Sequence, residues 1–211
     1  MYVQASFAET DPEKLLALAA RYPFATVITP GVDELWVSHV PLLVRRRDGA
    51  VVLSGHLARA NGHWQAMERG DGAPTTAIFH GPHAYISPTW YATSPAVPTW
   101  NYVVVHAAGK TRVHHDGPEL AGLLRELTER YEGRQVGAWS PDRLPDDFAQ
   151  PMRGAIVGFE IAVDRLEGKL KLSQNRSAED RRGVVAALEA QTSEDSRAIA
   201  ALMRETESNE S

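Results

Sequence analysis

Cysteine is absent from all 211 residues of the chain, which excludes disulfide bonds and thiolate metal ligands. This composition fits a reducing compartment. The first 14 residues also lack the basic and apolar blocks of a signal peptide. No apolar run approaches the roughly 20 residues that a membrane-spanning helix needs. We therefore expect a soluble, cytoplasmic protein that does not enter a membrane.

Positive charge is scarce as well. The net charge is −5, whereas a protein that holds DNA by its phosphates usually carries a clear positive excess. The one dense basic run, Arg45-Arg46-Arg47, precedes the turn-forming pair Asp48-Gly49, which predicts a solvated hairpin tip. No helix-turn-helix is recognisable. DNA therefore stays a weakly supported partner.

Sequence motifs of several enzyme classes are also missing. The chain contains no GxSxG, no Walker loop, no GxGxxG and no HExxH. Its eight histidines include one pair three residues apart, His80 and His83, and one adjacent pair, His114 and His115. Neither pair resembles a metal site without further ligands. We predict no bound metal ion and no nucleophilic catalysis.

The composition that is present is ordinary for a globular protein, with 43% hydrophobic and 23% charged residues. Apolar patterns predict about six strands, at 24–29, 35–46, 51–55, 75–79, 100–113 and 155–163. Helices are expected at 12–22, 59–69, 118–132, 178–189 and 193–205. These elements favour a mainly β fold with peripheral helices, a closed or nearly closed barrel, with an open α+β sheet as the alternative.

The first candidate site lies where a predicted strand meets a predicted helix, around Gly55. The first N–H groups of a helix attract anions, and a glycine allows close approach of the backbone. Arg59 can hold a phosphate through two parallel hydrogen bonds, with Asn61 beside it and Ser54 and His56 just upstream. The alternative is an ordinary capped helix with a surface arginine.

Aromatic residues gather in the next two candidates. The segment 79–91 combines them with prolines, which suits a rigid wall for a planar ligand or, alternatively, a loop that covers a barrel end. In the segment 97–102, Asn101 offers a donor and an acceptor to the edge of a pyrimidine-like ring. Its neighbour Trp100 can flank that ring or belong to the core.

The fourth candidate is the polar segment 168–176. Alternation places Lys169 and Lys171 on one face, where a cation can stabilise an anionic ring such as a reduced flavin. The alternative is a solvated turn that caps the following helix.

In their order along the chain, these segments resemble the PaiB family of FMN-binding negative transcriptional regulators. The resemblance covers the chain from Met1 to about Leu188. The matching stretches are Pro23-Phe24, Ser38-His-Val-Pro-Leu42, Gly55-His-Leu-Ala-Arg-Ala-Asn61, Gly81-Pro-His-Ala-Tyr-Ile-Ser-Pro-Thr-Trp-Tyr91, Val97-Pro-Thr-Trp-Asn-Tyr102 and Lys169-Leu-Lys-Leu-Ser-Gln-Asn-Arg176 with Asp180-Arg181. The spacer 92–96 departs from the family pattern because it lacks a lysine.

The resemblance implies an FMN-binding split β-barrel, similar to the pyridoxamine-phosphate oxidase fold, and a homodimer with the flavin at the interface. It implies phosphate contacts from Ser54, Gly55, His56, Arg59 and Asn61. The ring would lie near Pro41, Leu42, Trp100 and Asn101, and the site would be completed by the partner subunit's Lys171, Ser173, Gln174 and Arg176. Residues 1–176 would form this domain, 177–206 C-terminal helices packed on it, and 207–211 a disordered tail.

Three functions are compatible with these residues. The first is a negative transcriptional regulator that binds FMN and acts directly or indirectly. The second is a flavin-dependent oxidoreductase or flavin reductase for a small substrate, with His56, His83 and Tyr102 as candidates for proton transfer. The third is a haem-binding or haem-degrading split-barrel protein, which the histidines allow and do not require.

Overall fold

The computed structural model describes residues 1–69, 74–133 and 139–209, and the chain forms two compact units. The segments of unit 1 are Met1–Leu18, His80–Val105 and Glu167–Ser211. Those of unit 2 are Ala19–Phe79 and His106–Leu166.

Eight antiparallel strands within the described residues form one sheet, which does not close on itself. The strands are β1 (Ala8–Glu9), β2 (Phe24–Pro30), β3 (Leu35–Pro41), β4 (Leu43–Arg47), β5 (Ala50–Ala58), β6 (Pro74–Ile86), β7 (Thr99–His114) and β8 (Ile156–Lys171). Their order is β3-β2-β6-β7-β8-β5-β4, and β1 pairs with β8. The predicted mainly β fold is confirmed, with two strands more than the sequence indicated.

The chain changes strand partner at Leu42, where the sequence predicted one continuous strand. β3 pairs with β2 up to the contact of Phe24 with Pro41, and β4 pairs with β5 from Leu43 onward. Proline has no N–H to donate to a ladder, so Pro41 suits the last position of β3. Leu42 is buried between the two strands. The predicted turn after β4 is confirmed, since Asp48 and Gly49 have φ angles of 52° and 82°.

Two strands are much longer than predicted. β6 continues through the proline- and aromatic-rich stretch to Ile86, with Ala84 and Ile86 buried and Tyr85 exposed. β8 continues through the polar segment to Lys171, with Leu170 buried. Both extensions keep the two-residue alternation of a strand, which the prolines and lysines obscure in the sequence.

Six α-helices occur in the part of the chain that the structure describes. They are α1 (Pro12–Arg21), α2 (His63–Met67), α3 (Gly117–Glu132), α4 (Asp146–Gly154), α5 (Ala178–Glu189) and α6 (Glu194–Asn209). The predictions of α1, α3 and α5 are confirmed. The predicted helix 59–69 is wrong in length, and α4 was not predicted. Of the expected tail, 207–209 belong to α6 and 210–211 lie outside the described residues.

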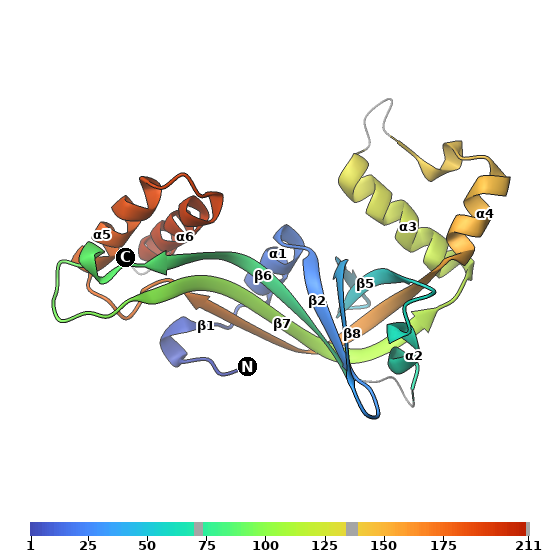
Figure 1. Ribbon diagram of the computed structural model, residues 1–211, viewed down its shortest axis with the longest axis horizontal. Coiled ribbons are helices and arrows are strands. Elements are labelled where there is room, and N and C mark those ends of the chain that lie inside the picture. The colour runs from blue at the N-terminus through green and yellow to red at the C-terminus, as the bar shows by residue number, and fades with distance from the viewer. Residues whose placement is uncertain (70–73, 134–138, 210–211) are drawn as a thin grey trace. The chain divides into compact units, whose positions relative to one another are not determined.

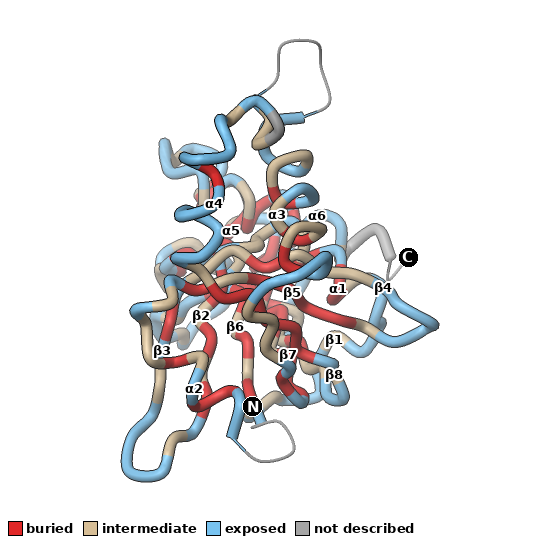
Figure 2. The backbone as a smooth tube through the Cα atoms, turned by 90° about the vertical axis from the view of Figure 1, so that its right-hand side faces the viewer, coloured by how far each residue is buried: buried red, intermediate tan, exposed pale blue. Residues whose placement is uncertain are grey.

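In unit 2, α3 packs on one face of β4, β5 and β8. Leu43 lies opposite Ser54, and Ser54 lies opposite Glu160, so these side chains point to the same face of the sheet. The apolar residues of α3 that are buried pack on this face, and Figure 2 shows buried segments along α3. The stripe consists of Leu120, Leu123 and Leu127, with Leu43, Leu124 and Ile156 against it. Each buried leucine stabilises the fold by roughly 1.5–3 kcal/mol.

In unit 1, α5 and α6 lie side by side (Figure 1). Val184, Leu188 and Met203 are fully or almost fully buried at their contact. The fully buried Asp180 of α5 accepts hydrogen bonds from the Thr93 backbone N–H at 2.9 Å and from its hydroxyl at 2.7 Å. These bonds hold the loop between β6 and β7 on α5.

Candidate functional site

The segment around Gly55 differs from its prediction. β5 continues to Ala58, and α2 begins only at His63 and has five residues, so Gly55 is not at a strand-to-helix junction. A Cβ atom at Gly55 would lie 2.6 Å from Leu42 Cδ2 and 3.1 Å from Phe159 Cζ. Core packing therefore requires glycine at this position. The space that a side chain would need is occupied by Leu42 and Phe159.

Arg59 is engaged by the backbone of its own unit. Its Nε donates to Gly154 O at 2.7 Å, and its Nη2 donates to His115 O at 2.7 Å and Ile156 O at 3.0 Å. Nη1 lies 3.2 Å from His115 Nδ1. The guanidinium therefore joins the end of α4 and the start of β8 to the segment after β7.

Asn61 and its neighbours form a buried polar network that the sequence did not reveal. The Asn61 amide donates to Ser38 Oγ at 3.1 Å, and Ser38 Oγ lies 2.8 Å from His63 Nδ1. His63 Nε2 lies 2.9 Å from Thr29 Oγ1, which lies 2.8 Å from Thr75 Oγ1. Burial lowers the pKa of His63 to about 4, so its imidazole is neutral at pH 7.

Two of the predicted contact residues, Ser54 and His56, share the face of β5 that α3 covers. Ser54 is fully buried, and neither Ser54 Oγ nor His56 Nδ1 has a hydrogen-bond partner among the described residues. Burial lowers the pKa of His56, which favours a neutral imidazole that can donate or accept. A buried polar atom without a partner costs free energy, so both atoms are suited to bind a polar ligand.

A cavity of about 630 Å³ in unit 2 adjoins His56. Its walls come mostly from α3, α4 and the segment before α4 and are mainly apolar, with Leu124, Leu127, Trp139, Leu144 and Met152. The charged residues of the lining are Arg125 and Arg153 and also Glu132 and Asp146. Pockets for cofactors usually have about 300–1,000 Å³, apolar walls and a few polar groups. The cavity thus has the size and apolar walls for a planar aromatic ligand, with two guanidinium groups available to an anionic tail.

The predicted site residues of unit 1 are held by hydrogen bonds within that unit, and two of them, Asn101 and Ser173, bind each other. Asn101 is fully buried, and its amide donates to Ser173 Oγ at 3.0 Å. Lys171 donates to Thr99 Oγ1. The Gln174 side chain accepts from Leu172 N at 2.7 Å. These bonds fix the turn after β8 against the start of β7.

Trp100 is the exposed member of the unit 1 set, and Arg176 is half-buried. Trp100 is 51% exposed, so the alternative that it belongs to the core is wrong. Its ring centroid lies 5.9 Å from that of Tyr85 and 6.0 Å from that of His83. The Arg176 guanidinium lies 4.3 Å from the Tyr91 ring centroid. Aromatic rings therefore do gather on β6 and β7, as predicted.

Of the residues predicted near the ring, Leu42 is buried in unit 2 and Pro41 is half-buried there.

The arginine triplet is not a free basic patch. Arg47 binds Glu160 through two hydrogen bonds of 3.0 and 2.8 Å, and Arg45 Nε lies 2.8 Å from Glu126 Oε2. The predicted solvated hairpin tip is confirmed for residues 46–50, which are exposed, and the ion-paired Arg47 side chain is itself 53% exposed. Of the triplet, only Arg45 is half-buried. Within the described ranges, no three side chains group to hold a metal ion, and no helix there has the length and apolar character needed to cross a membrane.

The fold is similar to those of solved flavoproteins. The flavocytochrome Anf3 from Azotobacter vinelandii matches with a TM-score of 0.61 and 18% identity, over 80% of this chain and 72% of that one. An FAD- and haem-binding protein from Mycobacterium smegmatis matches with a TM-score of 0.57 and 19% identity, over 85% and 79%. The sheet and these likenesses define a protein with the split-barrel fold of flavin-binding proteins, as the sequence predicted.

The family follows from the sequence comparisons. The family model "Putative FMN-binding domain" matches residues 1–165. "Protease synthase and sporulation protein PAI 2" of Bacillus subtilis (strain 168) is 32% identical over 205 residues, which cover 97% of both proteins. The chain belongs to the PaiB family of FMN-binding proteins, and the predicted cofactor, FMN, is supported by the same matches.

Proposed function

We propose that this protein is an FMN-binding negative regulator of transcription, and that its FMN lies in the cavity between α3 and α4. The observation that carries the location is the partnerless Nδ1 of His56, a residue that lines that cavity. The equally partnerless Ser54 Oγ lies on the same face of β5 but is fully buried and does not line the cavity. The regulatory role is supported by the 32% identity to a Bacillus subtilis protein named for protease synthesis and sporulation.

The residues of the cavity fit the parts of FMN. His56 supplies a hydrogen-bonding group, and Leu124 and Trp139 supply apolar surface for the ring. Arg125 and Arg153 supply positive charge for the phosphate. Bound FMN supplies one- and two-electron redox chemistry. Arg59 and Asn61 shape the site, because their polar groups already hold Gly154 O and Ser38 Oγ.

The active form in this proposal is a cytoplasmic homodimer. The family resemblance supports a further wall of the FMN site that is formed by the partner subunit's Lys171, Ser173, Gln174 and Arg176. Regulation is indirect, since the net charge is −5 and Arg45 and Arg47 are ion-paired with glutamates. Among the residues that the structure describes, no specific contact favours the oxidoreductase or haem interpretation.

The absorption spectrum of the purified protein tests the cofactor, followed by an FMN titration of protein that has been stripped of ligand. We expect a flavin spectrum and saturable quenching of FMN fluorescence. Replacing His56 by Leu should weaken FMN binding about tenfold, since the ring would lose one hydrogen bond in a buried site. A matched change at the exposed His83, His83→Leu, should have no effect. A protein that cannot be loaded with FMN would contradict the proposal.

A further inference from the structure

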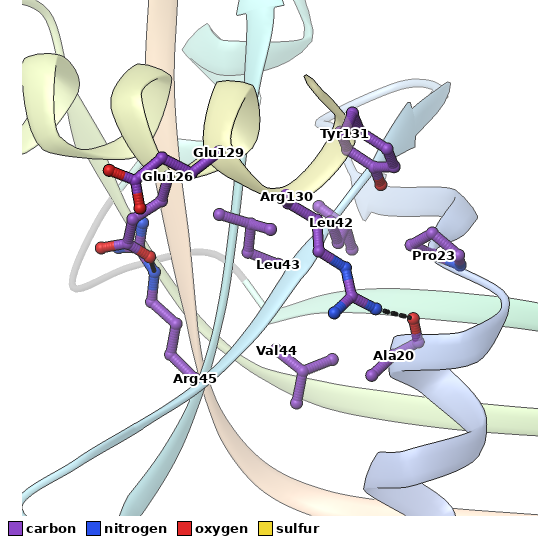
Figure 3. Close-up of a pocket in the computed structure, with 10 residues that line it drawn as sticks. All are labelled: Ala20, Pro23, Leu42, Leu43, Val44, Arg45, Glu126, Glu129, Arg130 and Tyr131. Carbon is purple, nitrogen blue, oxygen red and sulfur yellow. Dashed lines mark hydrogen bonds and ion pairs between the residues drawn. The ribbon is translucent and has the colours of Figure 1, made fainter. Parts of the chain in front are cut away.

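A second, smaller pocket of about 300 Å³ lies between the C-terminal half of α3 and β4, within unit 2. Figure 3 shows its two ends: Arg45 and Glu126 on one side, and Arg130 with Tyr131 on the other. Its floor is apolar and is formed by Pro23, Leu42, Leu43 and Val44. Tyr131 also lines the larger cavity, whereas the other residues of this pocket do not.

Arg45 has hydrogen-bonding capacity that its neighbours do not satisfy. Its side chain is 18% exposed, its Nε lies 2.8 Å from Glu126 Oε2, and its Nη1 lies 3.7 Å from Glu160 Oε1. Nη2 is buried and has no hydrogen-bond partner among the described residues. A buried donor without an acceptor costs about 1–3 kcal/mol, so an acceptor brought by a ligand would recover that free energy.

An anion is the acceptor that the guanidinium groups of the pocket can bind. Arg130 brings a second guanidinium to the pocket, where its Nη2 donates to Ala20 O at 3.0 Å (Figure 3). The lining also contains two carboxylates, of which Glu126 is ion-paired with Arg45 and Glu129 has interactions of its own. A carboxylate can accept from both guanidinium groups at once. The apolar floor of Leu43 and Val44 suits a hydrocarbon body.

We propose that this pocket binds a small organic carboxylate with an apolar body, at a site separate from that of FMN. The carboxylate lies between Arg45 Nη2 and Arg130, and the apolar body lies on Leu43 and Val44. α3 forms a wall of both sites, with Arg125 and Thr128 on the larger cavity and Glu126 and Arg130 on this pocket. Such a ligand would be an effector of the regulator, and the site itself does not depend on where FMN binds.

Three probes of similar shape and different charge test the site: benzoate, benzyl alcohol and benzylammonium. Binding is measured by calorimetry and by ligand-observed NMR on the full chain, with and without FMN. We expect saturable binding of benzoate, at least about tenfold tighter than either of the other two, because only benzoate supplies a negatively charged acceptor. Equal binding of benzoate and benzyl alcohol would overturn the proposal.

Substitutions locate the binding. Arg130→Gln and Arg45→Gln should each weaken benzoate about tenfold, whereas the neighbouring control Arg46→Gln should leave it unchanged. Arg130 is exposed, so Arg130→Gln gives an answer even where loss of the Arg45 ion pairs unfolds the protein. Unchanged benzoate affinity in Arg130→Gln would overturn the proposal. So would competition between benzoate and FMN, which would make the pocket part of the FMN site, whereas failure of FMN to bind at all would leave the benzoate result standing.

Discussion

Ser38 Oγ lies 2.8 Å from His63 Nδ1, and this hydrogen bond ties β3 to α2 in the interior of unit 2. Thr29 of β2 binds the other ring nitrogen, and Thr75 and Thr111 extend the chain of hydroxyl groups to β6 and β7. Every one of these side chains is buried. A buried network that is fully hydrogen-bonded fixes the relative register of the elements it joins, and loss of one member leaves the others without partners.

Replacing His63 by Leu should therefore destabilise the protein strongly. The change leaves the Ser38 and Thr29 hydroxyl groups without their ring partners in a buried site, and we expect a loss of about 2–5 kcal/mol in the free energy of unfolding. Urea unfolding followed by circular dichroism measures it. The exposed His83→Leu variant is the control. A loss below about 0.5 kcal/mol would show that the network does not stabilise the fold.

The same histidine predicts how stability depends on pH. The pKa of His63 is about 4 in the folded state, below the roughly 6.5 of an unfolded chain. Between these values the unfolded state binds the extra proton, so the stability present above pH 6.5 falls as the pH drops toward 4, by up to about 3 kcal/mol. Urea unfolding at a series of pH values should show this slope in the native protein and a smaller slope in His63→Gln. Parallel slopes for the two proteins would contradict the prediction.

Gly55 and Gly122 make a matched pair of glycine substitutions. Gly55→Ala places a Cβ atom 2.6 Å from Leu42 Cδ2, so the core must shift, and we expect a loss of about 1–3 kcal/mol. Gly122 lies within α3 with nothing within 4 Å of its added Cβ atom, so Gly122→Ala should raise stability by up to about 1 kcal/mol. Thermal and urea unfolding of both variants measure the difference. Equal stability of the two would show that Leu42 and Phe159 adapt without cost.

Glu160 should contribute to stability through its arginine partners. Burial alone raises the pKa of its carboxyl, but hydrogen bonds from Arg47 and the nearby charges lower it overall. The stability that this pair supplies is therefore present above the ordinary carboxyl pKa and is lost as the pH falls below it. Glu160→Gln should cost about 1–3 kcal/mol at pH 7 and flatten the acid limb of the stability profile. The exposed Glu205→Gln is the control, and an unchanged acid limb in Glu160→Gln would contradict this role.

Local patterns predicted those elements that depend on neighbouring residues. Three examples are the alternation in β2, the Asp48-Gly49 turn and the apolar stripe of α3. Each depends on residues within a few positions of one another, so the apolar period or the turn residues were sufficient to predict it. The interpretation of Gly55 was wrong because a glycine is equally typical of a turn and of a strand that packs closely against another residue. The residue that packs against it, Phe159, lies far away in the sequence.

The site required contacts that no local pattern contains. His63 is paired with Ser38 and Thr29, which precede it by 25 and 34 residues. Arg59 was assigned to a phosphate because its guanidinium geometry suits one, yet it meets carbonyl groups from about 95 residues downstream. Ser54 and His56 were selected as phosphate contacts, which stays a prediction, and only their burial under α3 shows that Ser54 Oγ and His56 Nδ1 lack partners.

Arg153 and Arg59 should differ in how strongly their loss weakens binding of the FMN phosphate. Arg153→Gln removes a cation that lines the cavity and makes no ion pair in the described structure, so we expect it to weaken FMN about tenfold and riboflavin much less. Arg59→Ala removes three bonds to backbone carbonyls, so it should lower stability and affect FMN and riboflavin equally. Fluorescence titrations with both flavins, alongside urea unfolding of each variant, separate these effects. A selective loss of FMN in Arg59→Ala would instead assign the phosphate to Arg59, and it would place the cofactor at the start of β8 rather than between α3 and α4.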